Sequence, residues 1–212
     1  MNEIYRWRGG SENLLRHGAG SPVTLLVLPA LFEEANRMRQ FTVSIMRNLA
    51  SRGIGTILPD LPGTGESETA LCDTVFDDWN DAVVALSRSV WGSVSFRGSA
   101  LLDHNFKKRW QFAPEAGERL LRDLARATAF SGGNSVADLE HQARTRPTRL
   151  AGNLLSPEMY LALHDAQVVG GAHICDVPGP KLWRAAEPTC DAAFAFQLAD
   201  DIATWVKKCA AS

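Results

Sequence analysis

The chain has 212 residues, of which 45% are hydrophobic and 22% are charged, and its formal net charge is -2 at pH 7. This composition is typical of one globular domain with an apolar core, and it excludes collagen-like and disordered chains. The near balance of 22 basic and 24 acidic residues creates no field that favours nucleic acid or anionic lipid. We therefore expect a single domain over residues 1–212 with no nucleic-acid partner.

The amino-terminal region carries charges throughout and lacks the apolar stretch of a signal peptide. The longest apolar run, Val23 to Phe32, is about half of the ~20 residues that a membrane-spanning helix needs. We expect a chain that is not exported and has no membrane span. No CxxC motif and no Cys/His cluster is formed by the cysteines, which are Cys72, Cys175, Cys190 and Cys209. This predicts reduced thiols, a cytoplasmic location, and neither a metal nor a cofactor.

The first predicted elements form a strand, a helix and a second strand. Val23 to Leu28 is a continuous apolar run, which is typical of a strand covered on both faces of a parallel sheet. From Glu33 to Arg52 apolar residues recur at spacings of three and four, and Gly53 follows, so we predict an amphipathic helix. Ile54 to Leu58 predicts the second buried strand.

The alternation of strands and helices continues along the chain. The next predicted elements are a helix over Asp77–Ser89, strands at Ser93–Phe96 and Arg109–Phe112, and a helix over Glu115–Phe130. Such alternation favours a mainly parallel sheet with helices on both faces. We expect the strands at 23–28, 54–58 and 93–96 to be neighbours in its core.

The carboxyl-terminal half is less regular. Residues 135–166 are more polar, Ser156 before a proline is a good helix start, and this segment could form a small helical lid. Short strands are predicted at Val168–Cys175 and Lys181–Ala185. The last helix is predicted over Asp191–Lys208, since its apolar residues lie on one face and two lysines occupy its final turn.

The loop Asp60–Ser67 has the sequence DLPGTGES and directly follows a predicted strand. Its glycines allow a tight reversal at the carboxyl edge of a sheet, where open α/β proteins bind ligands. A structural turn without a binding function would also explain these glycines. The sequence resembles the DxPGxGxS stretch that follows a central strand in α/β-hydrolases, with Thr64 at a position often held by histidine.

In that fold the strand at 93–96 should end in a nucleophile elbow, the sharp GxSxG turn. The chain has Ser95-Phe-Arg-Gly-Ser99 there, which puts Arg97 at the nucleophile position. Arginine is not deprotonated near neutral pH and cannot form an acyl intermediate. Ser95 and Ser99 remain weak nucleophile candidates, although their small size suits a crowded turn equally well.

The base of a catalytic triad is also missing from its expected place. In the α/β-hydrolase order the histidine comes after the last strand, but Leu182 to Ala186 is followed by Glu187 and no histidine. The histidines that follow the elbow are His104, His141, His164 and His173. A lone histidine in a helix or strand is more often structural. His173, preceded by Asp165, is the nearest substitute for the base.

Several stretches in matching order resemble the exosortase A system-associated hydrolases of the second type. They are Leu28–Arg39 (LPALFEEANRMR), Asp60–Ser67, Arg97-Gly98, Trp110–Pro114 and Leu182–Pro188. The resemblance implies an α/β-hydrolase-like three-layer sandwich with a mainly parallel central sheet. It also implies a bacterial exopolysaccharide or protein-sorting context. Because the chain is shorter than a typical α/β-hydrolase, a reduced sheet or lid is expected.

The loop after the first core strand normally supplies an oxyanion-hole donor in this fold. Glu33 and Glu34 follow this loop, and the helix dipole favours acidic residues in a first helical turn. Because Glu33 could also pair with Arg37, a structural role alone would explain these residues. Alternatively, Glu33, Glu34 or Asn36 faces Arg97 and forms a charged pocket with it. Glu34 is our preferred partner, because a buried guanidinium needs a carboxylate. The candidate substrate-binding residues are Arg97, Leu31, Phe32, Glu33, Glu34, Asn36 and Arg37.

Three functions follow from these observations. The first is a pseudo-hydrolase that binds a small anionic ligand or a partner protein near Arg97. The second is an active carboxylic-ester hydrolase that uses Ser93, Ser95 or Ser99 with an unconventional base. The third is a structural subunit of a polysaccharide assembly, which a homodimer or a copurifying partner would favour. We predict negligible serine-dependent ester hydrolysis, since neither nucleophile nor base is in its expected place.

Overall fold

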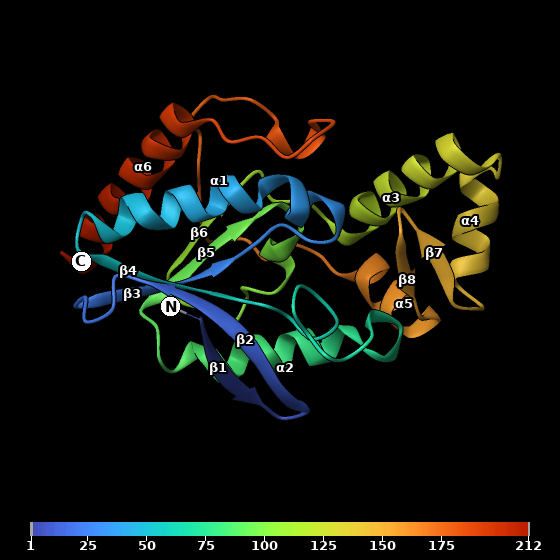
Figure 1. The fold of residues 1–212 in the computed structure, drawn as a ribbon, viewed down its shortest axis with the longest axis horizontal. Coiled ribbons are helices and arrows are strands. Elements are labelled where there is room, and N and C mark those ends of the chain that lie inside the picture. Colours follow the sequence, from blue (N-terminus) through green and yellow to red (C-terminus); the bar gives the residue numbers. More distant parts are fainter. Residues whose placement is uncertain (1, 212) are drawn as a thin grey trace.

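The computed structural model describes residues 2–211, which form a three-layer α/β sandwich with a seven-stranded sheet in the middle (Figure 1). The sheet consists of β1 (Asn2–Trp7), β2 (Gly10–His17), β3 (Val23–Leu28), β4 (Ile54–Pro59), β5 (Gly92–Phe96), β6 (Arg109–Phe112) and β9 (His173–Ile174). A separate hairpin contains β7 (Thr148–Leu150) and β8 (Asn153–Leu155). The α-helices are α1 (Glu33–Ala50), α2 (Phe76–Ser87), α3 (Gly117–Gly132), α4 (Val136–Ala143), α5 (Pro157–Asp165) and α6 (Ala192–Ala210).

The strands lie in the order β1-β2-β4-β3-β5-β6-β9. The pairs from β4 to β9 are parallel, whereas β1 and β2 add an antiparallel edge. Within β3, Leu26 lies opposite Ile57 of β4 and Ser93 of β5. The predicted neighbourhood of these three core strands is therefore confirmed, as is the mainly parallel sheet.

Both faces of the sheet are buried, which explains the uninterrupted apolar run of β3. Leu25 and Val27 contact the apolar cluster formed with α1 and α6, while Leu26 and Leu28 contact the cluster formed with α2 and α3. Figure 1 shows α1 and α6 together on one face and α2 on the opposite face. The two apolar clusters hold the three layers together through burial of hydrophobic surface.

The predicted helices are present with ends shifted by a few residues, and their caps follow the sequence signals. The Ser156 side chain accepts a hydrogen bond from the backbone of Met159 at the start of α5. Asp191 does the same for Phe194 at the start of α6. Gly53, which follows α1, has a φ of 75°, a conformation that favours glycine.

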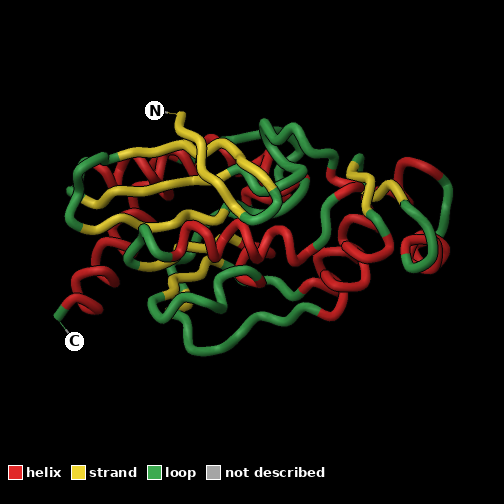
Figure 2. Tube along the Cα trace, turned by 90° about the horizontal axis from the view of Figure 1, so that it is seen from below, coloured by secondary structure: helices red, strands yellow, loops and turns green. Residues whose placement is uncertain are grey.

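The segment 135–166 contains α4, the β7-β8 hairpin and α5, so helices and a hairpin stand where helices alone were expected. This unit projects from one end of the molecule (Figures 1 and 2). Its side chains Leu139, Leu155 and Leu163 belong to the same apolar cluster as those of α2 and α3. The unit therefore shares the core of the sandwich.

The two late strands were predicted poorly. Of Val168–Cys175, only His173–Ile174 pairs with β6, because Gly171 has a φ of 90° and interrupts the extended chain just before it. The predicted strand Lys181–Ala185 is wrong, since Leu182–Arg184 forms a 3-10 helix, η3. Its apolar residues contact the cluster formed with α1 and α6 instead of pairing in the sheet.

The connection between the elbow and β6 is short. Residues Arg97–Leu101 form a short 3-10 helix, η2, after which the chain proceeds to β6 without a long helix. A second 3-10 helix, η1 (Leu71–Asp73), precedes α2. None of the helices within residues 2–211 has the length and apolar character to cross a membrane.

Candidate functional site

The turn after β5 has a strained backbone at the position of the predicted nucleophile elbow. Arg97 has a φ of 59°, which is strained for any residue with a side chain. Ser99 supports the turn, since its Oγ accepts from the Phe96 backbone at 3.1 Å and donates to the carbonyl oxygen of Leu28 at 2.9 Å. A Cβ atom at Gly98 would lie 2.8 Å from a methyl of Leu120, so a larger residue at this next position would displace the leucine side chain.

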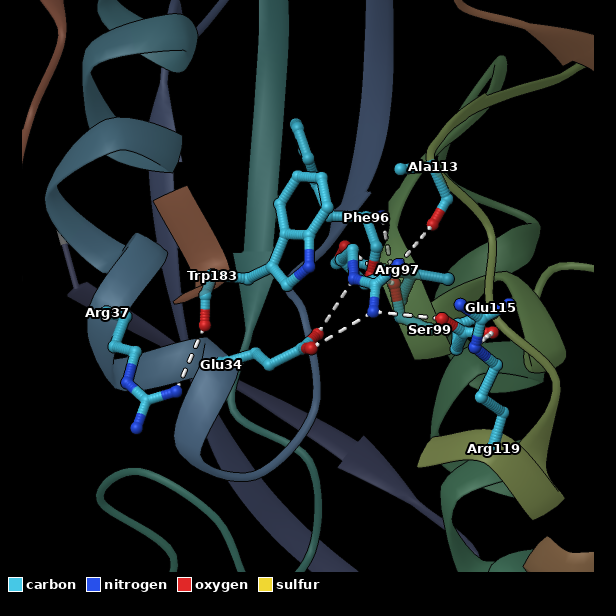
Figure 3. A network of polar contacts seen from close by, with 10 residues as sticks. Glu34, Arg37, Phe96, Arg97, Ser99, Ala113, Glu115, Arg119 and Trp183 are labelled. Atoms are coloured by element: carbon cyan, nitrogen blue, oxygen red, sulfur yellow. Dashed lines mark hydrogen bonds and ion pairs between the residues drawn. The ribbon is translucent and has the colours of Figure 1, made fainter. Parts of the chain in front are cut away.

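The Arg97 side chain is almost completely paired (Figure 3). Its Nε and Nη2 donate to the two carboxylate oxygens of Glu34, both at 3.1 Å, and Nη2 also donates to Glu115 at 3.0 Å. Nη1 donates to the carbonyl oxygen of Ala113 at 3.1 Å, and the ring centroid of Trp183 lies 4.5 Å from the guanidinium carbon. The residue is only 5% exposed. The predicted Arg97–Glu34 ion pair is therefore present.

The Arg97–Glu34 ion pair leaves no free charge for an incoming anion. Bidentate hydrogen bonding fits the planar guanidinium to the carboxylate of Glu34. Burial raises the pKa of Glu34, while the hydrogen bonds from Arg97 oppose that rise. The second carboxylate, Glu115, also lies 3.5 Å from the exposed Arg119. An anion approaching Arg97 would have to displace one of these carboxylates, which leaves it buried without a partner.

Sequence reasoning missed Glu115, Ala113 and Trp183. Ala113 has a φ of 45°, which turns the chain after β6 so that its carbonyl oxygen faces Arg97. The backbone nitrogen of Glu115 also donates to the carbonyl oxygen of Arg97 at 3.3 Å. One signal was available: Glu115 is the first acidic residue after the strand that neighbours the elbow strand.

Of the three candidate serines near the elbow, Ser95 and Ser99 have structural hydrogen-bond partners. Ser95 is fully buried and donates from Oγ to the Asp103 carboxylate at 2.7 Å. Gln111 donates to the same carboxylate at 2.9 Å. Burial raises the pKa of Asp103, and these hydrogen bonds oppose the rise. Ser93 is fully buried, and its hydroxyl has no hydrogen-bond partner within the described residues.

The histidines lie elsewhere. His173 is in β9, and its Nε2 lies 3.6 Å from Asp201 of α6. His104 contacts the carbonyl oxygen of Leu101, and His164 contacts Asp165. Within residues 2–211, no hydrogen bond or ion pair joins a histidine to the elbow or to a serine beside it.

Six of the seven candidate binding residues divide between two cavities, whereas Arg97 lines neither of them. The cleft over the elbow has a volume of about 310 Å³ and is lined by Glu33, Glu34, Arg37, Leu120, Asp123, Leu124, Ala127, Ala151, Trp183 and Arg184. Leu31, Phe32 and Asn36 line a second cavity of about 200 Å³. The expected Glu33–Arg37 pair is absent among the described residues, because Arg37 donates to the carbonyl oxygen of Trp183 at 3.0 Å.

The Asp60 loop borders the second cavity. The backbone of Glu66 donates to Asp60 Oδ2 at 3.2 Å, and Thr64 Oγ1 accepts from the backbone of Leu61 at 2.9 Å. Gly65 has a φ of 56°, and a Cβ atom there would overlap the Asp60 carboxylate. The loop glycines thus have a structural purpose, because they let the chain wrap around a buried carboxylate.

No protein-family model and no curated protein sequence matches the chain. Many solved structures resemble it, including the following two. A thermophilic esterase from Thermogutta terrifontis with bound malate has a TM-score of 0.55 at 13% identity, with 98% of each chain covered. Est1E from Butyrivibrio proteoclasticus with bound ferulic acid has a TM-score of 0.52 at 14% identity, with 78% of this chain and 72% of Est1E covered. These similarities show that the chain has the α/β-hydrolase fold.

Proposed function

We propose that this chain is a ligand- or partner-binding protein on the α/β-hydrolase fold, without serine-dependent hydrolysis. The proposal rests on Arg97, which occupies the strained elbow position with its guanidinium in four hydrogen bonds. An acyl intermediate requires a nucleophile at this place and a base beside it. The buried hydroxyls of Ser95 and Ser99 support the proposal, since both serve as internal hydrogen-bonding groups.

The binding site of this proposal is the cleft over the elbow. Its volume of about 310 Å³ suits a small ligand. Charges of both signs line it, from Glu33, Asp123, Arg37 and Arg184. Because the Arg97 guanidinium is already paired, we assign the recognition of an anionic group to Arg37 and Arg184.

Hydrolysis is tested with a fluorophosphonate probe and with p-nitrophenyl acetate, using an active esterase of the same fold as positive control. We expect neither labelling nor a burst. Arg97→Ser should not label either, because a serine there would lack a base. Labelling that disappears in Ser95→Ala or Ser99→Ala would instead establish the alternative, an ester hydrolase with an unconventional base.

Binding is tested by ligand-observed NMR with small carboxylates and inorganic phosphate. We expect saturable binding that the double variant Arg37→Gln, Arg184→Gln abolishes, whereas Arg146→Gln, at an exposed position outside the cleft, leaves it unchanged. Absence of binding together with a stable heteromeric complex would favour the structural subunit.

The cellular context belongs to this proposal as well. The sequence resemblance supports a protein that accompanies a bacterial exopolysaccharide or protein-sorting locus. The unclustered cysteines favour the cytoplasm as its location, and we include a homodimer as a candidate assembly. Deletion of the gene from its host should then impair exopolysaccharide production or protein sorting. Unchanged production and sorting would contradict this context without affecting the assignment of the cleft.

A further inference from the structure

The second cavity, of about 200 Å³, shares no lining residue with the cleft over the elbow. Its walls come from the loop after β3, from α1, and from the carboxyl end of β4 with the Asp60 loop. Its charged side chains are Arg39 and Asp60, while Leu31, Leu58 and Leu61 belong to its apolar lining.

The two charges face each other without a hydrogen bond. Arg39 Nη1 lies 3.8 Å from Asp60 Oδ1, which is too long for direct hydrogen bonding. The Asp60 side chain is 11% exposed, whereas that of Arg39 is 56% exposed. Burial raises the pKa of Asp60, and the Glu66 backbone and Arg39 oppose that rise. Within the described residues, Oδ1 accepts no hydrogen bond, so this oxygen is available to a ligand.

We propose that this cavity binds a small zwitterion of the α-amino-acid type with an apolar side chain. The ammonium group would donate to Asp60, the carboxylate would accept from Arg39, and the side chain would pack against the leucines of the lining. A cavity of about 150 Å³ already admits benzene, so this cavity admits a side chain of leucine size. The inference goes beyond the proposed function, because it concerns a separate cavity and does not require the cleft to bind anything.

The paired charges exclude simpler ligands. A lone ammonium ion would meet the attraction of Asp60 together with the repulsion of Arg39. A lone carboxylate would be attracted by Arg39 and repelled by Asp60. Only a ligand whose ammonium and carboxylate groups are attached to the same carbon or to nearby carbons satisfies both side chains, and complementary charges provide specificity in this way.

The experiment compares leucine with 3-methylbutylamine, which lacks the carboxylate, and with 4-methylpentanoate, which lacks the ammonium group. Titration calorimetry on the full chain should show leucine binding at least about tenfold more tightly than either analogue, since each loses a charge-assisted hydrogen bond. Arg39→Gln and Asp60→Asn should each weaken leucine binding about tenfold. Arg39 is exposed, so its variant tests the idea even if Asp60→Asn disturbs the loop.

Arg37→Gln is the matched control, because Arg37 lies on the same helix but lines the other cavity. It should leave leucine affinity unchanged while weakening anion binding in the cleft, which separates this inference from the proposed function. The inference is overturned if the amine binds as tightly as leucine and Arg39→Gln strengthens amine binding. Absence of saturable leucine binding to the unmodified chain overturns it as well.

Discussion

The side chain of Arg97 stabilises a strained turn through buried ion pairs. Its backbone keeps the strained φ of 59°, although the side chain offers no nucleophile. Such strain persists where the surroundings over-determine the conformation, and here Ser99 and the carboxylates of Glu34 and Glu115 do so. The guanidinium connects the elbow with the first turn of α1 and with the loop that follows β6.

Replacement of Arg97 by alanine should therefore be strongly destabilising. Glu34 would lose its partner and Glu115 would keep only Arg119, and breaking a buried pair in this way lowers the free energy of unfolding by about 3–5 kcal/mol. Chemical denaturation measures the change. Arg126→Ala removes an exposed ion pair with Asp123 on α3 and should change stability by less than about 1 kcal/mol. Similar stabilities of the two variants would show that the buried network contributes little.

The glycine at the centre of the Asp60 loop supports a second prediction. Gly65→Ala combines the strain of a φ of 56° with overlap against the Asp60 carboxylate. Gly133→Ala has the strain alone, since φ is 74° and no atom lies within 4 Å of the new Cβ. We expect Gly133→Ala to lower the free energy of unfolding by about 1–2 kcal/mol, and Gly65→Ala to lower it by clearly more. Equal losses in thermal unfolding would mean that Asp60 moves aside freely.

At the scale of elements, the amino-terminal strands stabilise the Asp60 loop. Tyr5 of β1 donates from its hydroxyl to the carbonyl oxygen of Asp60 at 2.8 Å. Glu12 of β2 accepts from Ser67 Oγ at 3.0 Å. Glu12 is buried, and burial together with the charge of Asp60 raises its pKa. The loop is thus held against an edge of the sheet that carries an unfavourable buried charge.

Glu12→Gln tests the sign of this effect. Since the pKa of Glu12 is higher in the folded chain, its ionisation destabilises the fold as pH rises from the unfolded value near 4 through the folded value. Glutamine keeps an acceptor for Ser67 and never ionises. The variant should be as stable as the parent at pH 4 and more stable at pH 7, as measured by urea denaturation. A variant that is less stable at pH 7 would contradict the destabilising charge.

The elements differ in how far the sequence predicts them. β3, β4 and α1 are predicted well, because burial on both sheet faces or on one helix face leaves a clear apolar period. The hairpin of β1 and β2 was not predicted, because an edge strand can expose apolar residues, such as Ile4 at 72% exposure. The Arg97–Glu34 pair could be predicted from the adjacency of β3 and β5 together with the need of a buried guanidinium for a carboxylate. The contact with Glu115 does not, because it depends on the positive φ of Ala113, which no composition rule indicates.

At the scale of the whole molecule, the unit over 135–166 is attached to the sandwich by close backbone packing. The Gly117 nitrogen, at the start of α3, donates to the carbonyl oxygen of Ala166 at 3.2 Å. A Cβ atom at Gly117 would overlap the carbonyl oxygen of Leu163 in α5. The start of α3 and the end of α5 are therefore in backbone contact, and this contact positions the unit beside the cleft that Glu33 and Ala151 line.

Gly117→Ala should loosen this attachment while leaving the central sheet intact. The methyl group forces the ends of α3 and α5 apart, and such overpacking costs about 1–3 kcal/mol. Hydrogen exchange should accelerate across α4 and α5, whereas the amides of β3 and β4 remain slow, because their packing depends on the two faces of the sheet. Gly132→Ala is the matched control in the same helix, since its new methyl meets no atom within 4 Å and alanine favours helix. If exchange accelerates equally in the sheet and in the unit, the unit is an inseparable part of the core and cannot move as a lid.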